Sequence, residues 1–234
     1  MRRALPAPAA IVVAALLVLI PHALEAQVCR GVPGEGATTG VTAATGSFWT
    51  TDRSLHSAGL RNVQPTELGR YGQEGGALDL RATVGRISPS YEPGYFQAEV
   101  HAEYFAPLVQ EDDYEFCVGT GIGWEYLTLT DPNNPDLRLN YFRVPLAASI
   151  GTMVEAGARD VNLYLTPAIN WYTARISETG GPFGLSGQAS GTNPTLDIGA
   201  GAPVGPGLIH LALRLNDRMY HESARILFGF TWNR

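Results

Sequence analysis

The sequence contains no lysine: all 16 of its basic residues are arginines, set against 22 aspartates and glutamates, for a formal net charge of −6. Lysine is common on water-exposed protein surfaces, so its absence argues against an ordinary soluble surface, although the base composition of a genome can have the same effect. The arginines also form no basic run. The composition therefore excludes an electrostatic surface for nucleic acid.

Long apolar runs are nearly absent as well. The one long apolar run covers residues 9–20. Arg2 and Arg3 precede it, and the small residue Ala26 comes shortly after it. It is shorter than the roughly 20 residues that a membrane-spanning helix needs. A basic start, a short apolar stretch and a small residue at the end are typical of a secretory signal peptide.

We therefore expect residues 1–26 to be removed on export, leaving an N-terminal segment at 27–38 and one domain at 39–234. No later run is long and apolar enough to cross a membrane as a helix. If the mature chain enters a membrane, it must do so as a closed β-barrel, because only that arrangement satisfies every backbone hydrogen bond without a helix.

Cysteine is scarce: only Cys29 and Cys117 are present. Export places them in an oxidising compartment, where such a pair can form a disulfide. We predict this disulfide, which would hold the N-terminal segment against the barrel wall or inside the lumen. The alternative is two free thiols.

Helical periodicity is missing from about residue 37 onward, and alternation of apolar and polar residues takes its place. In LIHLALRLN, residues 208–216, leucine or isoleucine occupies every second position from Ile209 to Leu215. This period of two predicts a β-strand with two different faces. Nine such stretches are visible, at 39–50, 77–87, 95–106, 114–128, 141–155, 161–176, 195–204, 207–216 and 223–233.

A closed barrel with both ends of the chain on one side needs an even number of strands. We favour ten, with a poorly patterned strand near 60–72; eight would require that 39–50 is not a strand. The turn-rich segments DPNNPD (131–136), EAGARD (155–160) and VGPG (204–207) join consecutive strands closely. Short connections indicate antiparallel neighbours, and hence an all-β, up-and-down antiparallel barrel. The glycine-rich stretch 180–194 is interpreted as an exposed loop.

The polar faces of the strands carry acids and arginines of balanced sign among small residues, whereas the other faces carry rows of large apolar residues. This distribution favours a transmembrane barrel with a polar lumen over a soluble barrel with an apolar one. The predicted lumen network consists of Asp79, Arg81, Glu99, His101, Glu103, Glu115, Glu125, Arg143, Asp197, His210, Arg214 and Arg225, with Asn162 and Asn170 on the same face.

Aromatic residues fall near the predicted strand ends, where outer-membrane barrels carry aromatic girdles at both membrane interfaces. An enrichment of aromatics in strands would look the same. The predicted girdle residues are Trp49, Tyr104, Trp124, Tyr126, Trp171 and Trp232.

The chain closes on ILFGFTWNR, in which Phe228, Phe230 and Trp232 alternate along the last strand. This pattern resembles the small OmpX-like or OmpA-like outer-membrane β-barrels of Gram-negative bacteria. The resemblance implies a monomer in the outer membrane, surrounded by lipid and lipopolysaccharide and inserted by the barrel assembly machinery. Counting strands back from the end then places VGPG and EAGARD in the periplasm and the loop at 178–194 outside the cell.

A barrel of eight to ten strands is filled by its own side chains, which excludes a general porin. The inward charges are then a salt-bridged plug or, alternatively, a narrow path for ions or protons. We expect a structural or interaction role through the outer loops. A narrow channel or transporter of small hydrophobic molecules, and a soluble periplasmic lipocalin-like ligand-binding barrel, remain alternatives.

One motif suggests an enzyme. HES, from His221 to Ser223, resembles the His-x-Ser of outer-membrane lipid A deacylases, which are serine hydrolases. A triad also needs an acid to orient the histidine, and no acid follows Ser223 in the sequence. The histidines lack metal-ligand spacing and the glycines of GTGIG precede no helix. We therefore predict no catalytic residue, no metal and no cofactor.

Overall fold

The computed structural model describes residues 38–48, 54–65, 76–88, 95–111, 114–131, 134–157, 159–179, 186–205, 207–215 and 222–233. These residues form ten β-strands: β1 (Thr38–Phe48), β2 (Ser54–Pro65), β3 (Ala77–Ser88), β4 (Tyr95–Gln110), β5 (Tyr114–Asp131), β6 (Asn134–Ala156), β7 (Arg159–Thr179), β8 (Ser186–Val204), β9 (Gly207–Leu215) and β10 (Glu222–Asn233). Within those ranges no helix is long and apolar enough to cross a membrane.

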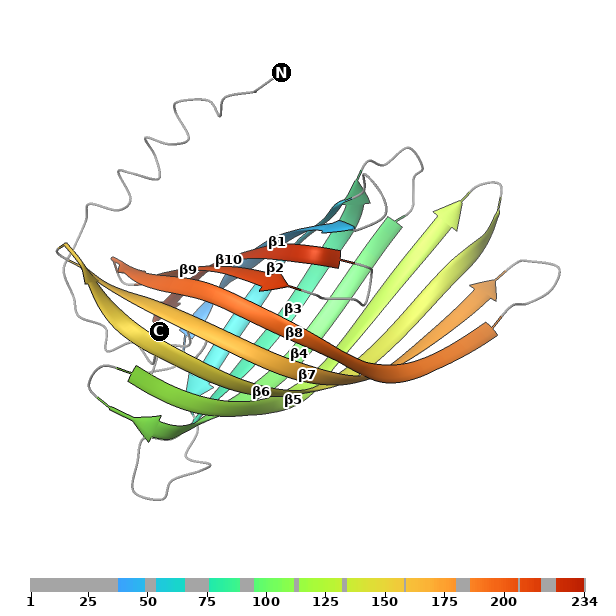
Figure 1. The fold of residues 1–234 in the computed structure, drawn as a ribbon. Helices are drawn as coiled ribbons and strands as arrows, with labels where there is room; N and C mark the ends of the chain where they lie inside the picture. The colour runs from blue at the N-terminus through green and yellow to red at the C-terminus, as the bar shows by residue number, and fades with distance from the viewer. Residues whose placement is uncertain are drawn as a thin grey trace, which may run out of the picture.

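The strands form one closed antiparallel barrel in which every strand pairs with its sequence neighbours (Figure 1). Closure comes from β1 and β10, which pair from Thr38 opposite Asn233 to Phe48 opposite Glu222. A closed sheet leaves no unpaired edge. The predicted all-β, up-and-down barrel of ten strands is confirmed.

Two of the predicted turns are tight because glycine takes a left-handed backbone conformation there. Gly157, between β6 and β7, has φ = 72°, and Gly205, between β8 and β9, has φ = 59°. Only glycine adopts such values without steric cost. These residues explain why EAGARD and VGPG connect neighbouring strands over so few residues.

The tenth strand exists, but it lies at 54–65 rather than near 60–72. The other difference is at 186–194, which we expected to be part of a loop and which is the first half of β8. Residues 186–192 are exposed on both faces of the sheet, so the sequence has no reason to alternate there. Backbone pairing with β7, from Ile176 opposite Gly187 to Trp171 opposite Thr192, holds this part in the sheet.

The apolar faces point outward and the polar faces inward. On β9, Leu211 is 52% exposed, whereas His210 and Arg214 are 8% and 4% exposed. The same division holds around the wall, with exposed side chains such as Leu60, Ile122 and Ile169 alternating with buried polar ones. A soluble lipocalin-like barrel requires the opposite arrangement.

The two ends of the barrel differ. We call the end where β1 starts and β10 stops the terminal end, and the opposite one the hairpin end. Strands β5, β6, β7 and β8 have 18, 23, 21 and 19 residues, whereas roughly ten residues suffice for a tilted strand to cross a bilayer. In Figure 1 these strands project beyond the rest of the wall at the hairpin end, on the right of the view.

Candidate functional site

The predicted lumen residues lie on the inner face of the barrel. All are buried except Arg81, whose side chain is 16% exposed. Arg61, Gln97 and Ser149 are buried with them and were missed by the sequence analysis. Arg61 lies within the strand expected near 60–72, but the inward series of β2 hides the alternation because it mixes apolar and polar residues: Leu55, Ser57, Gly59, Arg61 and Val63.

Asp79 is the centre of one ion-pair group. Arg61, on the neighbouring strand, donates two hydrogen bonds to its carboxylate, Nε to Oδ1 at 3.0 Å and Nη2 to Oδ2 at 2.9 Å. Arg81 donates from Nη2 to the same Oδ2 at 2.5 Å and lies 3.7 Å from Glu103. These fork-shaped contacts satisfy a carboxylate that is wholly removed from solvent.

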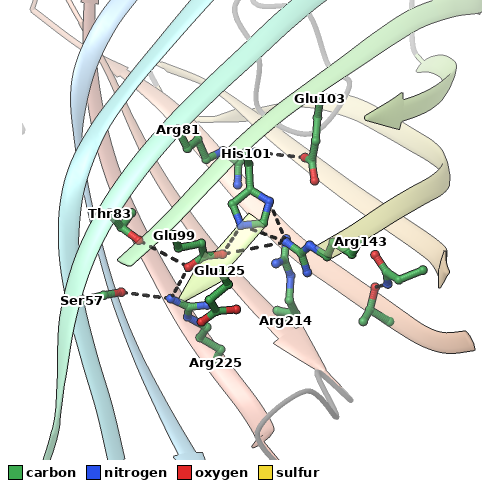
Figure 2. Close-up of polar contacts among 12 residues, drawn as sticks. Ser57, Arg81, Thr83, Glu99, His101, Glu103, Glu125, Arg143, Arg214 and Arg225 are labelled. Carbon is green, nitrogen blue, oxygen red and sulfur yellow. Dashed lines mark hydrogen bonds and ion pairs between the residues drawn. The ribbon is translucent and has the colours of Figure 1, made fainter. Parts of the chain in front are cut away.

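Glu99 is the centre of a second group, which connects strands that are not neighbours. Its Oε2 accepts hydrogen bonds from Arg225 Nη2 on β10 at 3.1 Å and from Thr83 Oγ1 at 3.3 Å. Arg143 on β6 lies 3.9 Å from its Oε1. Figure 2 shows Glu99 between these two arginines, with Ser57 accepting a second bond from Arg225.

His101 lies between Glu99 and Arg143. Its Nε2 contacts Glu99 Oε1, and Arg143 Nη2 donates to its Nδ1 at 3.1 Å. The same Nη2 is also 3.3 Å from Nε2, so the guanidinium lies against both ring nitrogens. The ring therefore links an acid on its own strand to an arginine on another.

A third group joins β8 and β9. Arg214 donates from Nε to Asp197 Oδ1 at 2.8 Å and from Nη2 to Oδ2 at 2.9 Å. Nearby on β9, His210 Nε2 is 2.5 Å from the hydroxyl of Tyr164, and the two rings stack with centroids 5.5 Å apart. The sequence predicted the charged residues of this group and missed the tyrosine.

Two other predicted residues are buried outside these groups. Glu125 accepts a hydrogen bond from Gln97. Glu115 is buried near the terminal end, two residues before Cys117, which is also buried on the inner face. The predicted partner of Cys117, Cys29, lies outside the described residues, so their disulfide stays a prediction.

Little space remains between these side chains. One cavity is lined by the Asp197–Arg214 pair together with Glu103 and Arg143. A second is lined by Arg61, Arg81, His210 and, again, Asp197. Each has room for about one or two water molecules. At these two places side chains fill nearly all of the described lumen.

Close packing in the lumen depends on glycines that accept aromatic rings from the neighbouring strand. A Cβ on Gly119 would lie 2.4 Å from the ring of Phe105, and one on Gly199 would lie 2.2 Å from the ring of Tyr164. Each glycine is directly opposite its aromatic partner in the register. The small inward residues are predictable from the sequence, but these pairings are not, because they depend on register.

The predicted girdle residues lie on the outer face where the structure describes them. Trp124, Trp171 and Trp232 are exposed, and Tyr104 and Tyr126 are half-buried. Trp124 stacks on Tyr126 with ring centroids 6.1 Å apart. Trp49 lies outside the described residues.

The HES motif is only partly described. His221 lies outside the described residues. The backbone of Ser223 is part of β10, but its side chain is not among those that the structure describes. Among the residues that are described, no three His, Cys, Asp or Glu side chains are arranged to hold a metal ion.

No protein-family model matches the chain, and no curated protein matches it. Solved structures do. The translocator domain of the autotransporter NalP from Neisseria meningitidis has a TM-score of 0.52 at 12% identity, over 85% of this chain and 89% of that one. The β domain of the Bordetella autotransporter Brka has a TM-score of 0.42 at 10% identity, over 85% of this chain and 99% of that one.

At these identities the likeness to NalP concerns the fold alone. The barrel has an apolar outer face and a polar inner face. Together with the fold, these faces define a β-barrel of the outer-membrane type. The particular OmpX-like or OmpA-like resemblance stays a prediction.

Proposed function

We propose that the protein is an outer-membrane barrel with a closed lumen, which acts as a membrane-anchored scaffold and offers its hairpin end to partners outside the cell. The apolar outer face and the predicted signal peptide at residues 1–26 support this location. The terminal end would then face the periplasm, and the projecting hairpins β5–β6 and β7–β8 would face outward. We further propose a monomer, embedded in outer-membrane lipid and lipopolysaccharide after insertion by the barrel assembly machinery.

The observation that carries the proposal is the Glu99 group. Its charges come from β4, β6 and β10, so the ion pairs cross the lumen instead of lining it. The two cavities beside these charges hold only one or two waters each, which supports a lumen that is closed to hydrated ions. Breaking a buried charge network of this kind is costly, which supports a stable plug over a gate that opens often.

The hairpin end supports an interaction role. Residues 186–192 of β8 read SGQASGT and are exposed on both faces, although they are paired to β7. Small and hydroxyl-bearing residues on a rigid projecting sheet provide hydrogen-bonding groups without an apolar surface that would aggregate. A protein that only anchors itself in the membrane would not need the projecting part of β5–β8, because roughly ten residues per strand are enough to cross a bilayer.

Conductance in planar bilayers tests the closed lumen. We expect the inserted wild-type protein to give no discrete current steps, and a variant with Glu99, Arg143 and Arg225 all changed to serine to give them. Heat-modifiable migration on gels confirms that both proteins are folded. Discrete steps from the wild type would overturn the scaffold proposal in favour of a narrow channel.

We also propose the Cys29–Cys117 disulfide. It would fix the N-terminal segment near the terminal end of the lumen, where Cys117 is buried. Intact-mass analysis after alkylation, with and without reductant, tests this pairing. We expect no alkylation of the native protein and two alkylated cysteines after reduction; two reactive thiols in the native, unreduced protein would refute it.

A further inference from the structure

The exposed arginines of the outer face lie at one end of the barrel. Where the structure describes side chains, the exposed arginines of the wall are Arg86, Arg138 and Arg175, all near the hairpin end of their strands. The exposed acids at the terminal end are not on the outer face: Glu155 and Asp160 continue the inward series of β6 and β7, and Glu111 follows the end of β4.

Two of the arginines are close together. Asn140 on β6 lies directly opposite Arg175 on β7, and Arg138 lies opposite Ser177, the next outward position along β7. Arg138 and Arg175 are therefore diagonal neighbours, whose side chains reach the same space from roughly 7–8 Å apart. Asn140, between them, adds an amide donor.

A cleft on the outer face begins at these residues. It is lined by Trp124, Asn140, Tyr141, Phe142, Thr173 and Arg175, and Arg138 lies beside it. It is a shallow depression that is open to the surroundings of the wall, so it would hold part of a larger ligand. Its polar wall is toward the hairpin end, and its aromatic wall is toward the middle of the barrel.

The order of these groups matches one kind of ligand. Trp124 and Phe142 are exposed, as aromatic residues at a membrane interface usually are. The guanidiniums of Arg175 on β7 and Arg138 on β6 lie one and two outward positions nearer the hairpin end than Phe142 and its partner Thr173. A lipid in the outer leaflet would place its acyl chains along the apolar wall and its headgroup at the arginines. Guanidinium binds phosphate with paired, charge-assisted hydrogen bonds.

We propose that Arg138, Asn140 and Arg175, next to Trp124 and Phe142, form a binding site for a phosphate of an anionic glycolipid in the outer leaflet. This inference rests on the proposed function, because that function places the hairpin end at the outer leaflet. It adds a specific site to the general lipid contact that any membrane barrel makes.

The test uses the mature protein folded in a zwitterionic detergent, with native mass spectrometry counting bound lipid. The probes are bisphosphorylated lipid A and the same lipid with its phosphates removed. We expect the wild type to retain the phosphorylated form, and Arg138→Gln/Arg175→Gln to bind it roughly tenfold to thirtyfold more weakly. Arg86→Gln is the control for a general loss of positive charge: it removes one arginine at the same end, on β3, where the double variant removes two, and binding should stay within about twofold.

Three results would overturn the site: equal retention of the dephosphorylated lipid, an equal loss in Arg86→Gln, or unchanged binding in the double variant. Retention of an acidic peptide instead of the lipid would point to a protein partner and would also overturn it. Failure of the proposed function is seen separately, as a wild-type protein that does not insert into vesicles. A protein that inserts but ignores the phosphates refutes this inference alone.

Discussion

Arg225 on β10 donates a hydrogen bond to Glu99 on β4, with Nη2 and Oε2 3.1 Å apart, although three strands separate β10 from β4 around the barrel. No backbone pairing connects these two strands. The ion pair is therefore a strut across the lumen, and it places two opposite charges where neither could be buried alone.

This strut predicts an asymmetric cost of substitution. Glu99→Gln removes the negative charge that faces Arg225, Arg143 and His101 and should lower the free energy of unfolding by about 3–5 kcal/mol. Thr83→Val, which removes only a 3.3 Å hydrogen bond to the same carboxylate, should cost about 1 kcal/mol. Reversible urea unfolding in lipid vesicles measures both. If the two variants cost the same, Glu99 is not the centre of a charge network.

The ring of Tyr164 predicts a steric effect at Gly199. Gly199→Ala places a Cβ 2.2 Å from that ring, so the ring must move and its 2.5 Å contact with His210 must change. We expect a loss of about 1–3 kcal/mol in unfolding free energy. On the same strand, Gly187 has nothing within 4 Å of an added Cβ, so Gly187→Ala should be neutral to within about 0.5 kcal/mol. Equal effects at both glycines would contradict the packing described.

The outer face predicts a dependence on depth. Leu146 is exposed on the outer face near the middle of β6, and Leu146→Arg would place a charge among acyl chains, at a cost of about 2–4 kcal/mol. Val154 is exposed two residues before the end of the same strand, and Val154→Arg should cost about 0–1 kcal/mol. The measurement is unfolding in vesicles compared with detergent. A smaller cost at 146 than at 154 would mean that the middle of β6 does not face lipid.

Much of the fold could be predicted from the sequence because the side-chain period of a strand is visible without its neighbours. The alternation of β9, β4 and β3 indicated both the strands and the inward residues. At β2 the pattern failed, since its inward positions mix Leu55 and Val63 with Ser57 and Arg61. At 186–192 both faces are exposed, so no period exists to be seen.

The sequence predicts which residues face the lumen, but it does not predict which of them contact one another. Alternation identifies Glu99, His101 and Arg225 as inward residues, but their meeting depends on the closure of the barrel and on register across several strands. The same holds for Phe105 opposite Gly119 and for Arg138 diagonal to Arg175. Alternation and short turns restrict the register of neighbouring strands, but they do not show which residues meet across the lumen.

The central claim is the orientation of the wall, and nitroxide labels on β9 of the protein in bilayers test it most directly. We predict that a label at position 211 collides often with oxygen dissolved in the lipid and rarely with a water-soluble nickel complex. A label at position 210 should be protected from both, because His210 is packed in the lumen. A label at 210 that meets oxygen in the lipid, with one at 211 shielded from it, would contradict the account.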